Sequence, residues 1–310
     1  MVDMAQVNAL LAAEDDRLTA GFTAPERPVT FIVAPPRAAS SLFQQVVASV
    51  YDVGYVSNTL ARFWRAPAIG AVLDKGLRDP LWVSNLRSRY GNTEGPQEPH
   101  EWGFFWHHWL RLEGDSFYAD PAARPLDGPG LNAKLAALEA TYDAPLMFDN
   151  VYAMANLDAL IPLLPRVLAV HLTRDPYFVC NSMLNARISR YGDINTFYAH
   201  PPRTMAALQR IADPVEQVVR QIKDILDEMD AALALLPADA VFKVDYLDMV
   251  ADPLAVADAF AAFLDRHGAP VRPRTPRPDL RLAHRNTPAQ VAPDLRDRLD
   301  AAFARVFGTP

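Results

Sequence analysis

Residues 29–50 read VTFIVAPPRAASSLFQQVVASV, and this stretch decides the fold. It begins with an apolar, β-branched run of strand length, which two prolines end. Arg37 follows with a fixed positive charge, Ser40 and Ser41 stand where a helix would begin, and apolar residues then recur at helical spacing. We therefore expect a strand, a short turn and a helix. The turn is either an anion site, where free N–H groups and the helix dipole favour phosphate or sulfate, or an ordinary turn capped by serine.

The same alternation continues along the chain. Further strand-length apolar runs lie at 145–148, 167–172 and 241–244, and helical patterns separate them at 131–142, 157–164, 177–187, 215–236 and 254–267. Strands that alternate with helices predict an α/β fold, in three layers with a central parallel sheet flanked by helices, as in P-loop proteins. Ligands of such folds bind beyond the carboxyl ends of the strands. No stretch reads as a linker, so we expect residues 1–310 to form one domain.

Composition narrows the class of protein. The net charge of −7 argues against a protein that coats nucleic acid. Cys180 is the only cysteine, which excludes an intramolecular disulfide and a cysteine-based zinc site and fits a cytoplasmic protein. The N-terminus lacks the basic start of a signal peptide, and no apolar run reaches the ~20 residues of a membrane span. We expect no integral membrane segment, and the sequence is compatible with a homodimer.

A second strand–turn–helix carries another arginine. The run at 167–172 is followed by Thr173, Arg174, Asp175 and Pro176, of which the last two suit the N-cap and first position of a helix. Arg174 then stands at the mouth of that helix, and Ser182 lies two turns further in. A nucleotide phosphate lying along the helix would contact both residues. The alternative is that Arg174 pairs with a neighbouring carboxylate and Ser182 packs.

The two segments, in this order, resemble those of sulfotransferases that use 3′-phosphoadenosine 5′-phosphosulfate (PAPS), of the bacterial type. Residues 36–42, PRAASSL, are similar to the Pro-Arg-Ser-Gly-Thr/Ser-Thr-Leu loop that holds the 5′-phosphosulfate. Residues 170–176, VHLTRDP, with Ser182, resemble the segment that holds the 3′-phosphate, and residues 244–253, VDYLDMVADP, resemble the stretch before the last large helix. The resemblance implies an N-terminal helix at 4–19, a nucleotide-binding core at 29–265, and a C-terminal loop and helix at 270–310.

The resemblance also implies an activity and its residues. The chain would move a sulfuryl group from PAPS to a hydroxyl of a small-molecule acceptor, without a metal. Arg37 would neutralise charge on the leaving phosphate, because its guanidinium stays charged and can bind two oxygens. The 5′-phosphate would be held by the loop residues Ala38, Ala39, Ser40 and Ser41, and the 3′-phosphate by Arg174 and Ser182.

The base must come from another segment. His100 and Glu101 lie in a turn before an aromatic segment, where relatives place a catalytic His or Glu. Histidine titrates near neutrality, so we expect His100 to accept the proton, with Glu101 orienting or replacing it. The alternative is that His100 is a loop residue and Glu101 caps the following helix. The aromatic side chains at 102–109 either line an acceptor pocket or pack in the core.

Two departures from the family pattern bear on activity. The usual Ser-Gly of the donor loop is Ala38-Ala39 here, and glycine normally supplies a positive φ and a close approach to phosphate. Asn150 stands where many relatives carry a lysine. These departures leave open a non-catalytic member of the fold that binds only a nucleotide or a partner. A P-loop kinase is the weaker alternative, because residues 34–41 contain neither glycine nor lysine.

Overall fold

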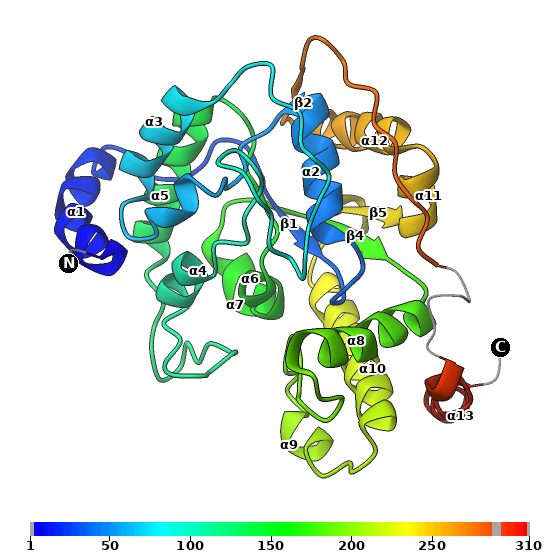
Figure 1. Ribbon diagram of the computed structural model, residues 1–310. Coiled ribbons are helices and arrows are strands. Elements are labelled where there is room, and N and C mark those ends of the chain that lie inside the picture. The colour runs from blue at the N-terminus through cyan, green and yellow to red at the C-terminus, as the bar shows by residue number, and fades with distance from the viewer. Residues whose placement is uncertain (1–2, 287–292, 309–310) are drawn as a thin grey trace.

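The computed structural model describes residues 3–286 and 293–308, and its centre is a parallel sheet (Figure 1). The sheet has the strand order β3-β1-β4-β5, with β3 at Met147–Phe148, β1 at Val29–Val33, β4 at Val167–Thr173 and β5 at Val241–Asp245. A separate antiparallel pair joins β2 (Tyr51–Asp52) to β6 (Arg272–Pro273). The predicted α/β class, with a parallel sheet flanked by helices, is confirmed.

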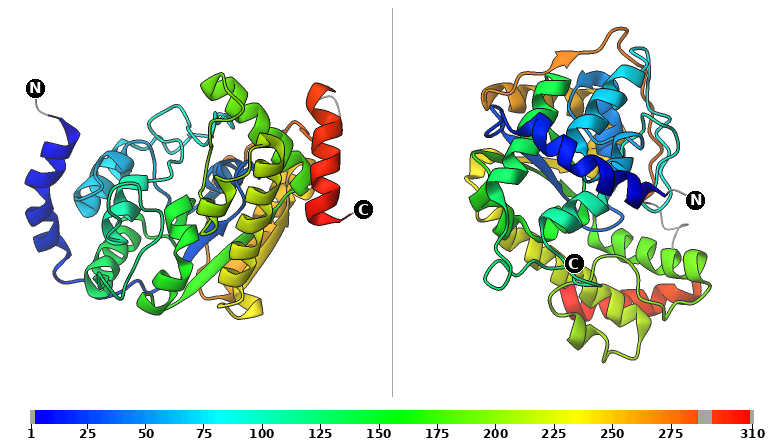
Figure 2. Two further views of the ribbon diagram at one scale, coloured as in Figure 1. Left: turned by 90° about the horizontal axis from the view of Figure 1, so that it is seen from below. Right: turned by 90° about the vertical axis from the view of Figure 1, so that its left-hand side faces the viewer.

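Helices connect the strands and cover the sheet. The longer ones are α1 (Met4–Thr19), α2 (Ser40–Val50), α3 (Pro67–Leu77), α5 (Gly128–Tyr142), α8 (Pro176–Tyr191), α10 (Pro214–Leu233), α12 (Pro253–Arg266) and α13 (Pro293–Phe307). The shorter ones are η1 (Leu60–Arg62), α4 (Gly103–Trp109), α6 (Val151–Ala155), α7 (Leu157–Leu160), η2 (Ile161–Leu163), α9 (Met205–Leu208), η3 (Ala238–Ala240) and α11 (Tyr246–Ala251). Figure 2 shows α1 and α13 at opposite ends of the molecule. The C-terminal segment expected at 270–310 includes residues 287–292 and 309–310, which lie outside the described residues.

Strand β1 divides the core into two layers, because successive side chains of a strand point to opposite faces. Val29, Phe31 and Val33 pack with the buried faces of α4, α5, α8 and α10. Ile32, on the other face, packs with α2 and α12, where Phe43 and Phe260 meet edge to face at 5.3 Å. All five residues of β1 are buried, as a central strand covered on both faces requires. In the part of the chain that the structure describes, no helix has the length and apolar character needed to cross a bilayer.

The aromatic helix α4 belongs to the first of these layers. Trp102, Phe105 and Trp106 are buried, and the Trp106 ring meets Phe31 at 5.5 Å and Phe148 at 5.2 Å. These rings therefore fix α4 against the sheet. For these three residues the structure supports core packing, whereas Phe104 of the same segment is exposed.

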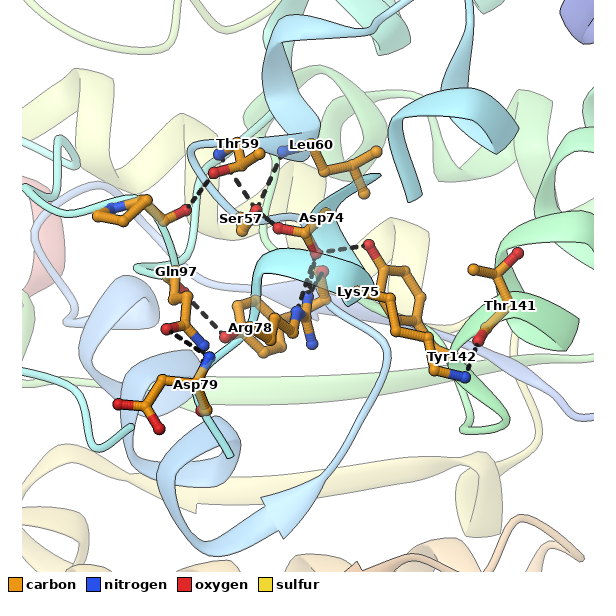
Figure 3. A network of polar contacts seen from close by, with 12 residues as sticks. Ser57, Thr59, Leu60, Asp74, Lys75, Arg78, Asp79, Gln97, Thr141 and Tyr142 are labelled. Carbon is orange, nitrogen blue, oxygen red and sulfur yellow. Dashed lines mark hydrogen bonds and ion pairs between the residues drawn. The ribbon is translucent and has the colours of Figure 1, made fainter. Parts of the chain in front are cut away.

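A buried carboxylate ties α3 to its surroundings (Figure 3). Asp74 is 1% exposed and accepts hydrogen bonds from the Ser57 hydroxyl, from Arg78 Nε at 2.8 Å and from the Tyr142 hydroxyl at 2.8 Å. The Arg78 guanidinium lies over the Tyr55 and Tyr142 rings, 4.3 and 4.5 Å from their centroids. The charged pair is thus fully hydrogen-bonded in a buried site, which is the condition under which such a pair is tolerated.

Candidate active site

A cavity of about 710 Å³ opens where the parallel strands end. The loop after β1, Asp149 and Asn150 after β3, Arg174 after β4 and Tyr246 after β5 all line it. Six arginines share its wall with two carboxylates. The arginines are Arg37, Arg87, Arg174, Arg190, Arg281 and Arg285, and the acids are Glu101 and Asp149. The cavity therefore suits an anionic ligand, although the whole chain carries a negative net charge.

The loop between β1 and α2 turns through two residues with positive φ. Arg37 has φ 68° and Ala39 has φ 75°, a region that costs a residue with a Cβ about 1–2 kcal/mol. Ala39 is the N-cap of α2 and forms no side-chain cap, so first-turn N–H groups of α2 have no partner from that side chain. The alanine thus takes the conformation that a glycine usually supplies, and Ser40 and Ser41 begin the helix beside it.

Arg37 and Arg174 are brought together by the paired strands β1 and β4. Arg37 Nε donates to the Ser182 hydroxyl of α8 at 3.1 Å, and Arg174 Nη1 donates to the Arg37 carbonyl at 2.6 Å. At the start of α8 the Asp175 carboxylate accepts from the Tyr177 N–H at 2.9 Å, as the sequence predicted for its N-cap. Ala39, Ser40, Ser41 and Arg174 line the cavity. Ala38 is instead buried in the core beneath α2, and Ser182 contacts the cavity only through Arg37.

Five arginines between residues 272 and 285 form a basic segment near the C-terminus, and it divides into two parts. Arg272, Arg274 and Arg277 bind acids or carbonyls outside the cavity. Arg281 and Arg285 line the cavity. Arg174 holds this second part in place, because its Nε donates to Asn286 Oδ1 at 2.8 Å.

Two carboxylates, Glu101 and Asp149, line the cavity together with the donor loop. Burial raises the pKa of Glu101, and the Asp149 carboxylate raises it further. Burial also raises the pKa of Asp149, although the hydroxyls of Ser40 and Ser41 offset part of this rise. With its pKa raised to about 8, Glu101 is mostly protonated at neutral pH, and its ionised form, which mildly alkaline pH favours, is the one that accepts a proton.

Glu101 is held on a rigid support. The side-chain amide of Asn150 donates to the Glu101 backbone carbonyl at 2.7 Å. Asn150, the residue that replaces the lysine of many relatives, therefore lies beside Glu101. Gly91, with φ 85°, leaves room for the carboxylate, because a Cβ there would stand 2.4 Å from Glu101 Oε1. Among the described residues, no hydrogen bond is made to the Glu101 carboxylate, so both oxygens can accept one.

His100 takes a different position. Its side chain is exposed, its Nδ1 accepts the Trp102 N–H at 2.8 Å, and it is not among the residues that line the cavity with Arg37. Although His100 is exposed as a residue, partial burial lowers its pKa. Of the two adjacent candidates, only Glu101 lines the cavity.

Sequence reasoning missed several cavity residues. Arg190 lies over the rings of Tyr90 and Tyr198, at 5.8 and 5.7 Å, and Arg37 lies over Tyr90 at 5.4 Å. The helical pattern was expected to end at residue 187, whereas α8 continues to Tyr191, so Arg190 was not placed on it. Arg190 lies eight residues after Ser182, a spacing typical of two residues on one broad helix face. This spacing was the only sequence signal that could have placed Arg190 near the site.

Comparisons with known proteins show the fold and the family. Sulfotransferase STF1 from Mycobacterium tuberculosis shares the fold with a TM-score of 0.54 and 18% identity over 84% of this chain and 74% of its own. Sulfotransferase STF9 from Mycobacterium avium gives a TM-score of 0.53 and 17% identity over 97% of this chain and 80% of its own. No curated protein sequence matches the chain significantly. The model of the sulfotransferase family matches residues 28–268, from β1 to just beyond α12, and the chain therefore belongs to the sulfotransferase family.

Proposed function

We propose that the protein transfers a sulfuryl group from PAPS to a hydroxyl of a small-molecule acceptor. The observation that carries the proposal is the cavity at the carboxyl ends of the strands, where Arg37 and Arg174 stand beside the uncapped start of α2. Such a site offers two separate cationic positions and a row of backbone donors to one ligand. PAPS carries a phosphosulfate and a 3′-phosphate and matches this division of charge.

The donor-binding residues have distinct tasks in this proposal. The backbone N–H groups at the start of α2, from Ala39 to Ser41, bind the 5′-phosphate, whereas the Ala38 N–H is already bonded to the Pro35 carbonyl. Arg174 binds the 3′-phosphate, Arg285 adds a further cation to the same wall, and Ser182 positions Arg37 beside them. Burial lowers the pKa of Arg174, yet its guanidinium remains fully charged at neutral pH. No metal is needed, because arginines and helix N–H groups neutralise the anion.

The chemical step divides between Arg37 and Glu101. PAPS supplies the activated sulfur, whose bond to the phosphate oxygen breaks as the acceptor oxygen attacks. Arg37 stabilises the negative charge that develops on the departing phosphate. In its ionised form, Glu101 accepts the proton of the acceptor hydroxyl, since among the described residues its carboxylate lines the cavity free of hydrogen bonds. His100, outside the cavity, orients the start of α4 through the Trp102 N–H.

Calorimetric titration tests the donor assignment. Adenosine 3′,5′-bisphosphate, the desulfated donor, should bind about ten- to a hundredfold more tightly than AMP, because only the bisphosphate reaches Arg174 with a second phosphate. Equal affinity for the two nucleotides would show that the protein does not recognise the 3′-phosphate. Absence of binding by either would leave a sulfotransferase fold without donor chemistry.

The general base is tested by turnover with a hydroxyl acceptor. Glu101→Gln keeps the size and burial of the side chain and removes its proton acceptor. We expect unchanged bisphosphate affinity and turnover lowered by ~10²–10⁴. His100→Ala, one residue away, is the matched control. A larger loss of turnover in His100→Ala than in Glu101→Gln would show that His100 is the general base.

A further inference from the structure

The cavity wall contains a buried histidine that the chemistry above does not use. His200 is 3% exposed, lines the cavity, and stacks on Phe117 with ring centroids 4.8 Å apart. Its Nδ1 is buried and has no hydrogen-bond partner in the described part of the chain. Native proteins rarely leave such an atom unpaired unless water or a ligand completes it.

The hydrogen bonds around His200 determine which nitrogen carries the proton. The Tyr118 hydroxyl lies 3.1 Å from His200 Nε2, 2.7 Å from Glu228 Oε2 and 3.0 Å from the Pro201 carbonyl. The carboxylate and the carbonyl can only accept, so the single Tyr118 proton goes to one of them. Tyr118 must then accept from His200, and the Nε2–H is the donor. The lone pair of a neutral ring is left on Nδ1.

The neutral form of His200 is maintained by its surroundings. Burial lowers its pKa to about 3, and the nearby Arg203 guanidinium contributes to this shift. Arg203 also fixes the network, because its backbone N–H donates to Glu228 Oε1 at 2.6 Å and its guanidinium lies 4.2 Å from the Tyr118 ring centroid. His200 is thus a fixed hydrogen-bond acceptor and a poor base at physiological pH.

We propose that His200 Nδ1 selects acceptor substrates by accepting a hydrogen bond from an O–H or N–H group other than the hydroxyl that is sulfated. This inference rests on the proposed function. The neighbouring cavity wall is largely apolar, with Phe117, Val151, Met154 and Ala199. The acceptor class is therefore a compound with an apolar or aromatic body and two hydrogen-bond donors. A site built around a buried polar atom rejects an analogue that leaves it unpaired.

The test uses protein labelled with ¹⁵N at histidine and titrated with catechol, resorcinol and hydroquinone, each beside its monomethyl ether. The His200 imidazole signals should report the Nε2–H tautomer from pH 5 to pH 9. At least one diphenol should shift the Nδ1 signal and bind about tenfold or more tightly than its ether. Failure of every diphenol to shift that signal, or equal affinity of each pair, overturns the proposal.

Two variants separate recognition from packing. His200→Phe keeps a ring beside Phe117 and removes Nδ1, so the preference for diphenols should be lost. Tyr152→Phe is the control, because its ring lies 4.6 Å from Phe117 and its hydroxyl is not part of this network. A preference that persists in His200→Phe refutes the role of His200 Nδ1. The titration needs neither donor nor turnover, so its failure is distinct from failure of bisphosphate binding.

Discussion

Replacing Ala39 by glycine should stabilise the protein. At φ 75° the alanine pays about 1–2 kcal/mol relative to glycine. Glycine in turn loses about 0.4–1 kcal/mol through its greater freedom in the unfolded chain. The balance is a gain of about 0.5–1 kcal/mol in the free energy of unfolding. The loop already holds the positive φ, so affinity for adenosine 3′,5′-bisphosphate should be unchanged or higher.

The adjacent alanine provides the matched control. Ala38 is 1% exposed, belongs to the core layer under α2 and is not among the residues with positive φ. Ala38→Gly therefore loses a buried methyl group and gains no relief, and it should cost about 1–2 kcal/mol. Urea unfolding followed by circular dichroism measures both variants. The reasoning fails if Ala39→Gly is less stable than the parent, or if the two variants are equally stable.

Further variants test the two arginine sites, the carboxylates and the buried network. Arg174→Ala should weaken bisphosphate binding about ten- to a hundredfold while AMP binding changes little; equal losses in calorimetry would contradict its role. The free energy of unfolding should fall as pH rises from about 4 through the raised pKa values of Glu101 and Asp149, because both carboxyls bind protons more strongly in the folded than in the unfolded state. Glu101→Gln should make this decrease smaller when unfolding is measured at a series of pH values. Asp74→Ala should cost about 3–5 kcal/mol in urea unfolding, since it leaves Arg78 buried without its carboxylate, and a cost below about 1 kcal/mol would show that the network does not hold α3.

The strands and the helix starts could be predicted from the sequence because local chemistry determines them. The apolar runs at 29–34, 167–172 and 241–244 correspond to β1, β4 and β5 within a residue. Pro176, one residue after a good N-cap, fixed the start of α8. Such signals depend on neighbours in the chain and need no knowledge of the tertiary contacts.

The rest of the site depends on contacts between distant segments. The role of His200 follows from Tyr118 and Glu228, which no spacing in the sequence brings together. His100 is exposed while Glu101 lines the cavity, and the chain turns directly after them at Trp102, which has φ 56°. No residue type other than glycine favours a positive φ strongly enough to predict it. Neither this turn nor the conformation of Ala39 could therefore be predicted from the sequence.

The order of the strands along the chain also governs how the protein is made. Strand β1 is synthesised early, but the strands that pair with it on either side, β3 and β4, follow more than a hundred residues later. At about 5–20 residues per second, a ribosome takes roughly 5–30 s to supply them. During that interval an apolar segment has both of its edges unpaired and can join a neighbouring nascent chain. Yield of the native protein should therefore depend on translation speed and on chaperones that hold this first strand until its partners emerge.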